Sequence, residues 1–331
     1  MSLSKSIIFS AIQPSGQLTL GNYIGTISHW MHMQDIYHCI YSIADLHAIT
    51  VNQNKKLFRK NIFDTLALYL AVGVNPKKSI IFLQSEVQEH CQLNWILNCH
   101  THFGELMRMT QFKKKSKVNS SNINIGLFNY PILMAADILL YQSHKVLVGK
   151  DQMQHVELVR DIAKRLNFLY GHIVTVPEVY IPNINGAKIM ALLNPNNKMS
   201  KSDNNINNVI FLLDNHESIL KKITRSVTDS DNKIFYDIKN KPGISNLLNI
   251  YSSLTGISIA VLENMLMNTT YKHFKLLVAQ SISEKLLQLQ EQFYYFKNKK
   301  NYLRDILDFG ACVAKKQAKK TMKKIYNVLG L

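Results

Sequence analysis

Residues 7 to 25 constrain the fold of this chain more than any other stretch. Ile7, Ile8 and Phe9 open it as a short apolar run typical of a buried strand, and Pro-Ser-Gly at 14–16 ends that strand. From Gly21 onward the apolar residues recur at helical spacing. A strand, a turn of small residues and a helix direct free backbone N–H groups at an anion. The glycines fit neither G-x-G-x-x-G nor a P-loop, so a strand that simply leads into a core helix explains this stretch about equally well.

Strand and helix patterns alternate in the first part of the chain. They follow the order strand 38–43, helix 55–72, strand 80–83, helix 89–109, a helix that begins at Pro131, and strand 146–148. This alternation predicts an α/β fold with a mostly parallel sheet. After Ser202 strand patterns are sparse, and 209–226 and 244–331 have helical spacing. We therefore expect one domain at 1–203 and an all-helical domain at 204–331, whose last helix, about 310–331, packs back on the first domain.

Composition limits the possible partners without identifying one. The 331 residues include 39 Lys and Arg against 22 Asp and Glu, a formal charge of +17 that favours a polyanion such as RNA. A general enrichment in Lys, Asn and Ile explains the same excess. The four cysteines are scattered, so disulfides are not expected. The sequence predicts neither a membrane span nor a signal peptide, and we expect a cytoplasmic protein.

One segment is rich in potential metal ligands. It contains His90, Cys91, Cys99, His100 and His102. No C-x-x-C pair is present, and Cys91, Leu93, Trp95, Ile96 and Cys99 can share the core face of one helix. We therefore expect a core helix and no structural metal.

A second motif changes the interpretation of the first. Lys198-Met199-Ser200-Lys201-Ser202 places two cations and two hydroxyls together in an Asn-rich stretch. Pro14-Ser15-Gly16-x-x-Thr19-x-Gly21-Asn22 followed by Lys-Met-Ser-Lys-Ser resembles the two signatures of class I aminoacyl-tRNA synthetases. The first is similar to the variant form of the HIGH element in tryptophanyl-tRNA synthetases, and the second matches KMSKS letter for letter.

The resemblance to bacterial tryptophanyl-tRNA synthetases extends through nearly the whole chain. It includes the segments 45–50, 104–113, 130–141, 149–152 and 241–248. It implies a Rossmann-like catalytic domain that ends with the Lys-Met-Ser-Lys-Ser loop, and a helical domain that recognises the anticodon. It also implies a homodimer that uses ATP with Mg²⁺ to activate L-tryptophan and then charges tRNA(Trp).

Asp137 is the residue most indicative of a substrate. It lies in the apolar run 132–141, where a carboxylate would be buried and would need a partner. A helix N-terminus or a core arginine could satisfy it. Alternatively it accepts the indole N–H of tryptophan, a group that can only donate. Such a site would reject phenylalanine, because the acid would then lose its partner.

The resemblance implies roles for further residues. Tryptophan binding involves Asp137 with Phe9, His47, Tyr130, Met134 and Gln152. ATP binding involves Gln13, Pro14, Ser15, Gly21, Asn22, Gly149, Lys150, Asp151, Ile189, Lys198, Met199, Ser200, Lys201 and Ser202. Lys115, Lys198, Lys201, Gln13 and Asn22 are the candidate catalytic residues. The chemistry needs an aligned ATP α-phosphate and stabilised pyrophosphate, so positioning and positive charge suffice.

Three positions depart from the pattern of the family. Ala11 replaces an expected glycine, Leu46 replaces an expected Gln, and Lys150 replaces an expected acid, which puts any ribose or metal role of that side chain in doubt.

Two alternative functions stay open. A tyrosyl-tRNA synthetase shares the architecture, although its first signature usually ends in His where this chain has Asn22. An inactive relative that binds tryptophan or RNA as a regulator would not need Lys198 and Lys201.

Overall fold

The computed structural model describes residues 5–111, 124–149, 152–181, 188–201 and 203–331. They form two compact units. Unit 1 comprises the chain up to Ser15, Met31–Ile181 and Lys299–Leu331, and unit 2 comprises Gly16–Trp30 and Pro182–Asn298. The functional division at residue 204, with a catalytic part before it and an anticodon-binding part after it, stays a prediction.

A parallel sheet forms the centre of unit 1. Its strands lie in the order β3-β2-β1-β4-β5, and every neighbouring pair is parallel. They are β1 (Ile7–Ile12), β2 (His38–Ile43), β3 (Ile80–Leu83), β4 (Lys145–Leu147) and β5 (Glu178–Tyr180). β1 to β3 are apolar and largely buried, because helices cover both faces of such a sheet. The α/β class with a Rossmann-like sheet is confirmed.

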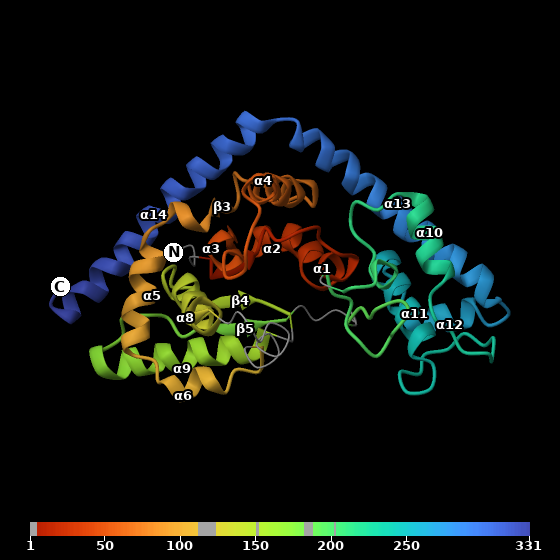
Figure 1. The fold of residues 1–331 in the computed structure, drawn as a ribbon, viewed down its shortest axis with the longest axis horizontal. Coiled ribbons are helices and arrows are strands. Elements are labelled where there is room, and N and C mark those ends of the chain that lie inside the picture. Colours follow the sequence, from red (N-terminus) through yellow and green to blue (C-terminus); the bar gives the residue numbers. More distant parts are fainter. Residues whose placement is uncertain (1–4, 112–123, 150–151, 182–187, 202) are drawn as a thin grey trace. The chain divides into compact units, whose positions relative to one another are not determined.

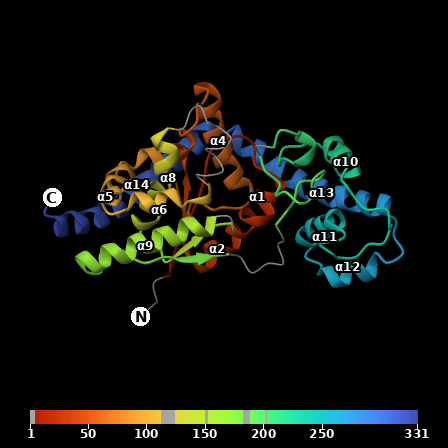
Figure 2. The same ribbon diagram turned by 60° about the horizontal axis from the view of Figure 1, so that its bottom comes forward.

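The helices of unit 1 enclose the sheet. They are α2 (Trp30–Ile36), α3 (Asp45–Ala48), α4 (Lys55–Ala71), the 3₁₀ turn η2 (Gln84–Glu86), α5 (Glu89–Cys99), α6 (Phe103–Met107), α8 (Ile125–Leu139), α9 (Met153–Tyr170) and α14 (Lys300–Leu329). Figure 1 shows α14 beside α5 and β3, and Figure 2 shows α9 next to β5. A continuous apolar core joins sheet and helices, with Phe82, Leu139 and Ala314 inaccessible to solvent.

Gly310 allows α14 to approach the sheet closely. A Cβ at this position would fall on the carbonyl oxygen of Ile81 in β3. Glycine weakens a helix interior, but here it is the residue whose backbone fits against a strand.

Two helix boundaries differ from the sequence-based predictions. Pro131 does not begin a helix: α8 starts at Ile125, where the Asn124 side chain accepts a hydrogen bond from the Leu127 N–H (2.8 Å), and Pro131 lies inside it. This Asn cap was hidden in a polar stretch that resembles a loop. The helix expected over 89–109 is divided into α5 and α6, because the chain leaves helical geometry after Cys99.

Unit 2 is predominantly helical. It contains α1 (Leu20–Gly25), η1 (Ile27–His29), η4 (Ile206–Asn208), α10 (His216–Thr224), α11 (Pro242–Thr255), α12 (Ile259–Met265) and α13 (Tyr271–Lys297). The helix expected over 209–226 is therefore confined to α10. α13 packs against both α10 and α11. Within the described ranges no single helix is long and apolar enough to cross a membrane, although α11 and α12, bent by 107°, pass that test as a pair by length and composition.

Candidate active site

Four polar side chains meet at the carboxyl edge of the sheet in unit 1. β2 leads into α3, which carries His47, and β3 leads into η2, which begins with Gln84. α5 contributes His90, and α8 contributes Asp137. Ligands of open parallel sheets bind outside this edge of the strands. The cluster therefore lies where the fold places a ligand.

Asp137 accepts hydrogen bonds from all three neighbours. The His47 Nε2–H donates to Oδ2 (2.7 Å), the His90 Nδ1–H donates to Oδ1 (2.6 Å), and the Gln84 amide donates to Oδ1 (2.7 Å). Asp137 is only 2% exposed, so each donor offsets a large desolvation cost. A helix N-terminus or a core arginine, the simpler partners considered from the sequence, are not what satisfies this acid.

Further hydrogen bonds fix the orientation of the donors. His90 Nε2 is hydrogen-bonded to the Tyr141 hydroxyl (2.8 Å), so contacts at both ring nitrogens hold the imidazole with its Nδ1–H facing Asp137. The Leu46 N–H donates to Gln84 Oε1 (3.2 Å), so the Gln84 NH₂ group must face the carboxylate. The cluster is therefore preorganised by its own backbone and core.

The carboxylate of Asp137 is held in its charged form. Burial raises its pKa, but the charges and hydrogen bonds of His47 and His90 outweigh burial and hold the pKa well below its ordinary value. A carboxylate accepts about four hydrogen bonds, and the three donors of the described chain leave room for one more, on Oδ2. This arrangement suits a substrate group that can only donate.

The other residues expected to bind the substrate tryptophan also lie in unit 1, and some of them contact this cluster. Phe9 stacks on Tyr141 with centroids 5.9 Å apart, and the Tyr130 ring lies 6.4 Å from that of His47. The Tyr130 hydroxyl is hydrogen-bonded to His155 (2.7 Å), and burial raises its pKa to about 12. Met134 is half-buried against the core, and Gln152 is the N-cap residue of α9.

Gln84, His90 and Tyr141 belong to the site but were not among the site residues expected from the sequence. Gln84 directly follows a predicted buried strand, and this position could have marked it. His90 was considered only as a possible metal ligand. No group of three or more His, Cys, Asp or Glu suited to a metal occurs in the part of the chain that the structure describes. Cys91, Trp95 and Cys99 are exposed, so the core face expected for them was wrong.

Unit 2 contains most of the two signature motifs. Thr19 caps α1: its hydroxyl accepts from the Asn22 N–H (3.2 Å) and donates to Asn22 Oδ1 (3.1 Å). The Asn22 oxygen is thereby used within the turn, and its NH₂ group is the donor suited to a phosphate. A Cβ on Gly21 would lie 3.6 Å from Ile189 Cβ and 3.7 Å from Met199 Cβ. The first signature and the Lys-Met-Ser-Lys-Ser stretch are therefore in contact.

The Lys-Met-Ser-Lys-Ser stretch presents its cations to solvent. Met199 is buried, whereas Lys198, Ser200 and Lys201 are exposed. Lys115, Lys150, Asp151 and Ser202 lie outside the described residues. In unit 1, Pro14 is buried and Gln13, Ser15 and Gly149 are half-buried.

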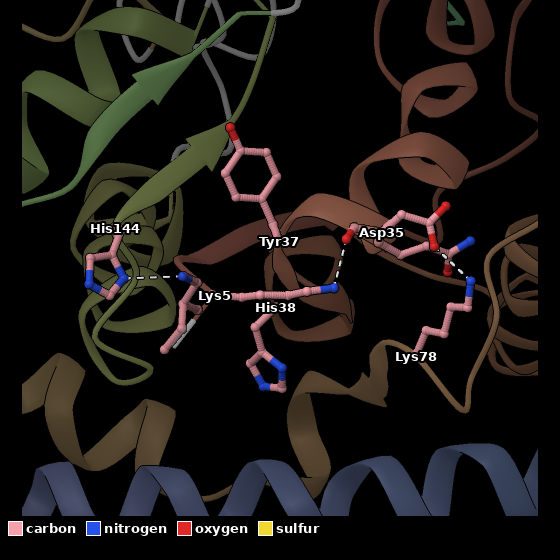
Figure 3. A pocket seen from close by; sticks show the side chains of 8 residues that line it. Lys5, Asp35, Tyr37, His38, Lys78 and His144 are labelled. Carbon is pink, nitrogen blue, oxygen red and sulfur yellow. Dashed lines mark hydrogen bonds and ion pairs between the residues drawn. The ribbon is translucent and has the colours of Figure 1, made fainter. Parts of the chain in front are cut away.

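The amino edge of the same sheet holds a different cavity, of about 760 Å³ (Figure 3). Its charged groups are engaged with one another: Lys78 pairs with the Asp35 carboxylate (2.6 Å), and Lys5 donates to the Asp35 carbonyl (2.7 Å). His144 accepts from the Ile7 N–H (3.1 Å), while burial and nearby Lys5 lower the pKa of His38. These contacts hold the chain together where the strands begin.

Comparison with known proteins identifies the family. The model of the class I tRNA synthetases for tryptophan and tyrosine (W and Y) matches residues 1–288. A tryptophan–tRNA ligase of Buchnera aphidicola subsp. Acyrthosiphon pisum (strain APS) is 54% identical over 100% of this chain and 99% of its own length.

Solved structures agree with this assignment. The tryptophanyl-tRNA synthetase of Mycoplasma pneumoniae has a TM-score of 0.91 at 35% identity, covering 99% of this chain and 98% of its own. That of Campylobacter jejuni, complexed with ADP and tryptophan, has a TM-score of 0.81 at 34% identity, covering 98% and 100%. The chain therefore belongs to the class I tRNA synthetases for tryptophan and tyrosine, and within them to the tryptophanyl-tRNA synthetases, which are ligases.

Proposed function

We propose that this chain activates L-tryptophan with ATP, releases pyrophosphate, and transfers the tryptophan to tRNA(Trp) for protein synthesis in the cytoplasm. The observation that carries this proposal is the charged, buried Asp137 with acceptor capacity left on Oδ2. The relative from Campylobacter jejuni, whose complex contains ADP and tryptophan, supports the choice of both substrates.

Asp137 selects the amino acid in this proposal. The indole N–H donates to Oδ2, beside the hydrogen bond from His47. A phenylalanine side chain offers no donor, and the buried carboxylate would then lose a hydrogen bond that tryptophan supplies. Phe9, Tyr130, Met134 and Gln152 complete the pocket. The preorganised donors around Asp137 keep it charged before the substrate arrives.

The signature motifs handle the nucleotide. Gln13, Pro14, Ser15, Gly21 and Asn22 hold ATP, with Gly149 and Asp151 on the ribose side and Ile189 and Met199 against the adenine. Lys150, between Gly149 and Asp151 in the sequence, contributes its backbone. Lys198 and Lys201 neutralise the departing pyrophosphate, since lysines act as point charges on flexible stems. Lys115 is a third candidate cation for this step, and Ser200 and Ser202 complete the loop. ATP enters as its Mg²⁺ complex, with the cation carried mainly by the phosphates.

The helical part from 204 to 331 is the proposed site of anticodon recognition. Its net positive character suits a polyanion, and the positive charge of the chain is consistent with an RNA partner. Transfer of tryptophan then requires the tRNA 3′ end to reach the activated amino acid in the catalytic part.

We also propose that two copies of the chain associate through unit 1. Trp95 on α5, Phe103 on α6 and Ile125 on α8 are 71%, 70% and 79% exposed. Near them lies a depression of about 360 Å³, lined among others by Ile49, Asn94 and Gly126. Asn94 and Gly126 directly adjoin Trp95 and Ile125 in the sequence, and exposed apolar side chains beside a depression favour a protein–protein contact.

A pyrophosphate-exchange assay tests the substrate. With ATP, labelled pyrophosphate and the purified chain, we expect exchange that depends on tryptophan and not on tyrosine or phenylalanine. Exchange with tyrosine alone would contradict the proposal. Tight tryptophan binding with neither exchange nor charging of tRNA(Trp) would instead favour a regulator.

Asp137→Asn is expected to weaken tryptophan selection. The amide cannot accept from His47, His90 and a substrate N–H as the charged carboxylate does, and hydrogen bonds to charged groups contribute about 1.5–3 kcal/mol. The KM for tryptophan in the exchange assay should rise about 10- to 100-fold, as that energy implies. The KM for ATP should change much less. Equal increases in both would remove the assigned role of Asp137.

Lys201→Ala should lower the rate of activation. Loss of a charge that stabilises the leaving group costs on the order of 100-fold in kcat when the contact is made in the transition state. Lys221→Ala on α10 removes the same charge from another exposed site of unit 2 and serves as the control. Equal exchange rates for Lys201→Ala and the wild type would exclude Lys201 from the step.

Trp95→Lys should shift the chain from dimer to monomer. A buried interface cannot accommodate an unpaired ammonium group, whereas an exposed helix surface can. Light scattering coupled to size-exclusion chromatography measures the mass directly. A wild-type chain of 38.0 kDa that elutes as a monomer would refute the proposed association.

A further inference from the structure

Lys198 and Met199, the first two residues of the Lys-Met-Ser-Lys-Ser stretch, lie in the second arm of a short antiparallel hairpin within unit 2. Met190 and Lys198 face each other as an antiparallel bridge. On either side of that pair, the Met199 N–H donates to the Ile189 carbonyl (3.0 Å) and the Ala191 N–H donates to the Asn197 carbonyl (2.8 Å). In such a ladder, the N–H and C=O of the pair between the hydrogen bonds point outward. The outward groups of Met190 therefore need a partner outside the hairpin.

Asn246 on α11 supplies that partner for both groups. Its Oδ1 accepts from the Met190 N–H (2.8 Å), and its Nδ2 donates to the Met190 carbonyl (3.0 Å). Asn246 is 3% exposed, so these hydrogen bonds are shielded from water. The Asn246 amide thus makes the two hydrogen bonds that a neighbouring strand would make to Met190. Met190 is in turn the residue that pairs with Lys198.

The helix that carries Asn246 is itself firmly anchored. Lys241, at the N-cap of α11 and 4% exposed, bonds to Asp229 (2.8 Å), Asp231 (2.8 Å) and the Tyr271 hydroxyl (3.0 Å) at the start of α13. A Cβ on Gly243 would fall on the Val227 carbonyl oxygen, so α11 lies tightly against that segment. The Val227 N–H in turn donates to the Leu192 carbonyl in the hairpin (3.0 Å).

The hairpin also contacts the first signature. Ile189 and Met199, the residues on either side of the Met190–Lys198 pair, lie against Gly21 of α1. A shift of Met190 relative to α11 would therefore change both the position of Lys198 and the contact with Gly21. Catalytic groups lose rate steeply when they are misplaced by about 1 Å.

We propose that Asn246 is a positioning residue for amino-acid activation: by holding Met190 at two points, it fixes the hairpin that presents Lys198 and Lys201 to the pyrophosphate. Asn246 touches no reacting atom and acts only through the hairpin. This inference rests on the proposed function of the two lysines. The tryptophan site around Asp137 belongs to unit 1 and does not depend on this contact.

Asn246→Ala and Asn246→Asp test the proposal, with Asn249→Ala as the matched control. Asn249 lies on the same helix, is similarly buried (5% exposed), and makes its side-chain contact to the Tyr236 hydroxyl instead of to the hairpin. Asn246→Asp keeps the shape and one acceptor, but it loses the donor to the Met190 carbonyl. It therefore tests the contact even if Asn246→Ala does not fold.

Two measurements are needed. Hydrogen exchange of the peptide that contains Met190 should become faster in both Asn246 variants and stay unchanged in Asn249→Ala. In the pyrophosphate-exchange assay, kcat should fall about 10- to 100-fold in the Asn246 variants. Their dissociation constant for tryptophan should equal that of the wild type. General loss of structure would instead lower kcat and weaken tryptophan binding together.

Several outcomes would overturn the inference. Unchanged hydrogen exchange would show that Asn246 does not hold the hairpin, whether or not the chain is active. Faster hydrogen exchange with wild-type kcat would show that the contact has no role in activation. Parallel loss of tryptophan binding and kcat in both Asn246 variants would show that Asn246 supports the whole fold and has no specific positioning role in activation. If the wild type is inactive in the exchange assay, the proposed function is contradicted, and so is the role of Asn246 in activation. Slow hydrogen exchange at Met190 that depends on Asn246 would then still show the contact itself.

Discussion

The buried carboxylate of Asp137 is the constraint on which the rest of unit 1 depends. An acid that is 2% exposed must have donors at hydrogen-bond distance from both oxygens, and these come from the end of β2, the end of β3 and the start of α5. The strands must therefore end together, and α5 must pack beside α8. Tyr141 connects this cluster to the apolar core, because its hydroxyl is hydrogen-bonded to His90 and its ring stacks on Phe9 of β1. The hydrogen bonds to one ionised carboxylate thus determine where the strands end and place the candidate site at that edge of the sheet.

Hydrophobic periodicity was sufficient to predict much of the sheet but not all of it. β1 to β4 each contain a short apolar run typical of a buried strand, whereas β5 has an exposed Glu178 and half-buried neighbours at the sheet edge. Pro131 lies inside α8 because the preference of proline for the first helical turn is only statistical, while Asn124 supplies the actual cap. Trp95 was expected inside because it is apolar. At helical spacing it lies opposite Leu93 and Leu97, and the structure leaves it exposed.

The candidate site was predictable only where one residue was unusual for its surroundings. Asp137 stands out in an apolar run, and the two lysines stand out in a matched motif. Gln84 and His90 do not, because a polar residue after a strand and a histidine near cysteines each have several ordinary explanations. Their role depends on contacts 53 and 47 residues away in sequence, which no local pattern encodes. The same holds for Asn246, which lies 56 residues from the backbone it binds.

The residues proposed to select tryptophan and those proposed to stabilise pyrophosphate need different physical environments, and the chain provides both. Selection of an amino acid by one hydrogen bond requires a buried acceptor with room for one further donor, because an acceptor in water would bond to any donor. The proposed stabilisation of pyrophosphate requires cations that a leaving group can reach, and Lys198 and Lys201 are exposed. Flexible side chains act reproducibly only if the backbone beneath them is fixed. The buried Asn246 amide, which binds both outward groups of Met190, holds the backbone on the opposite arm of the hairpin from Lys198.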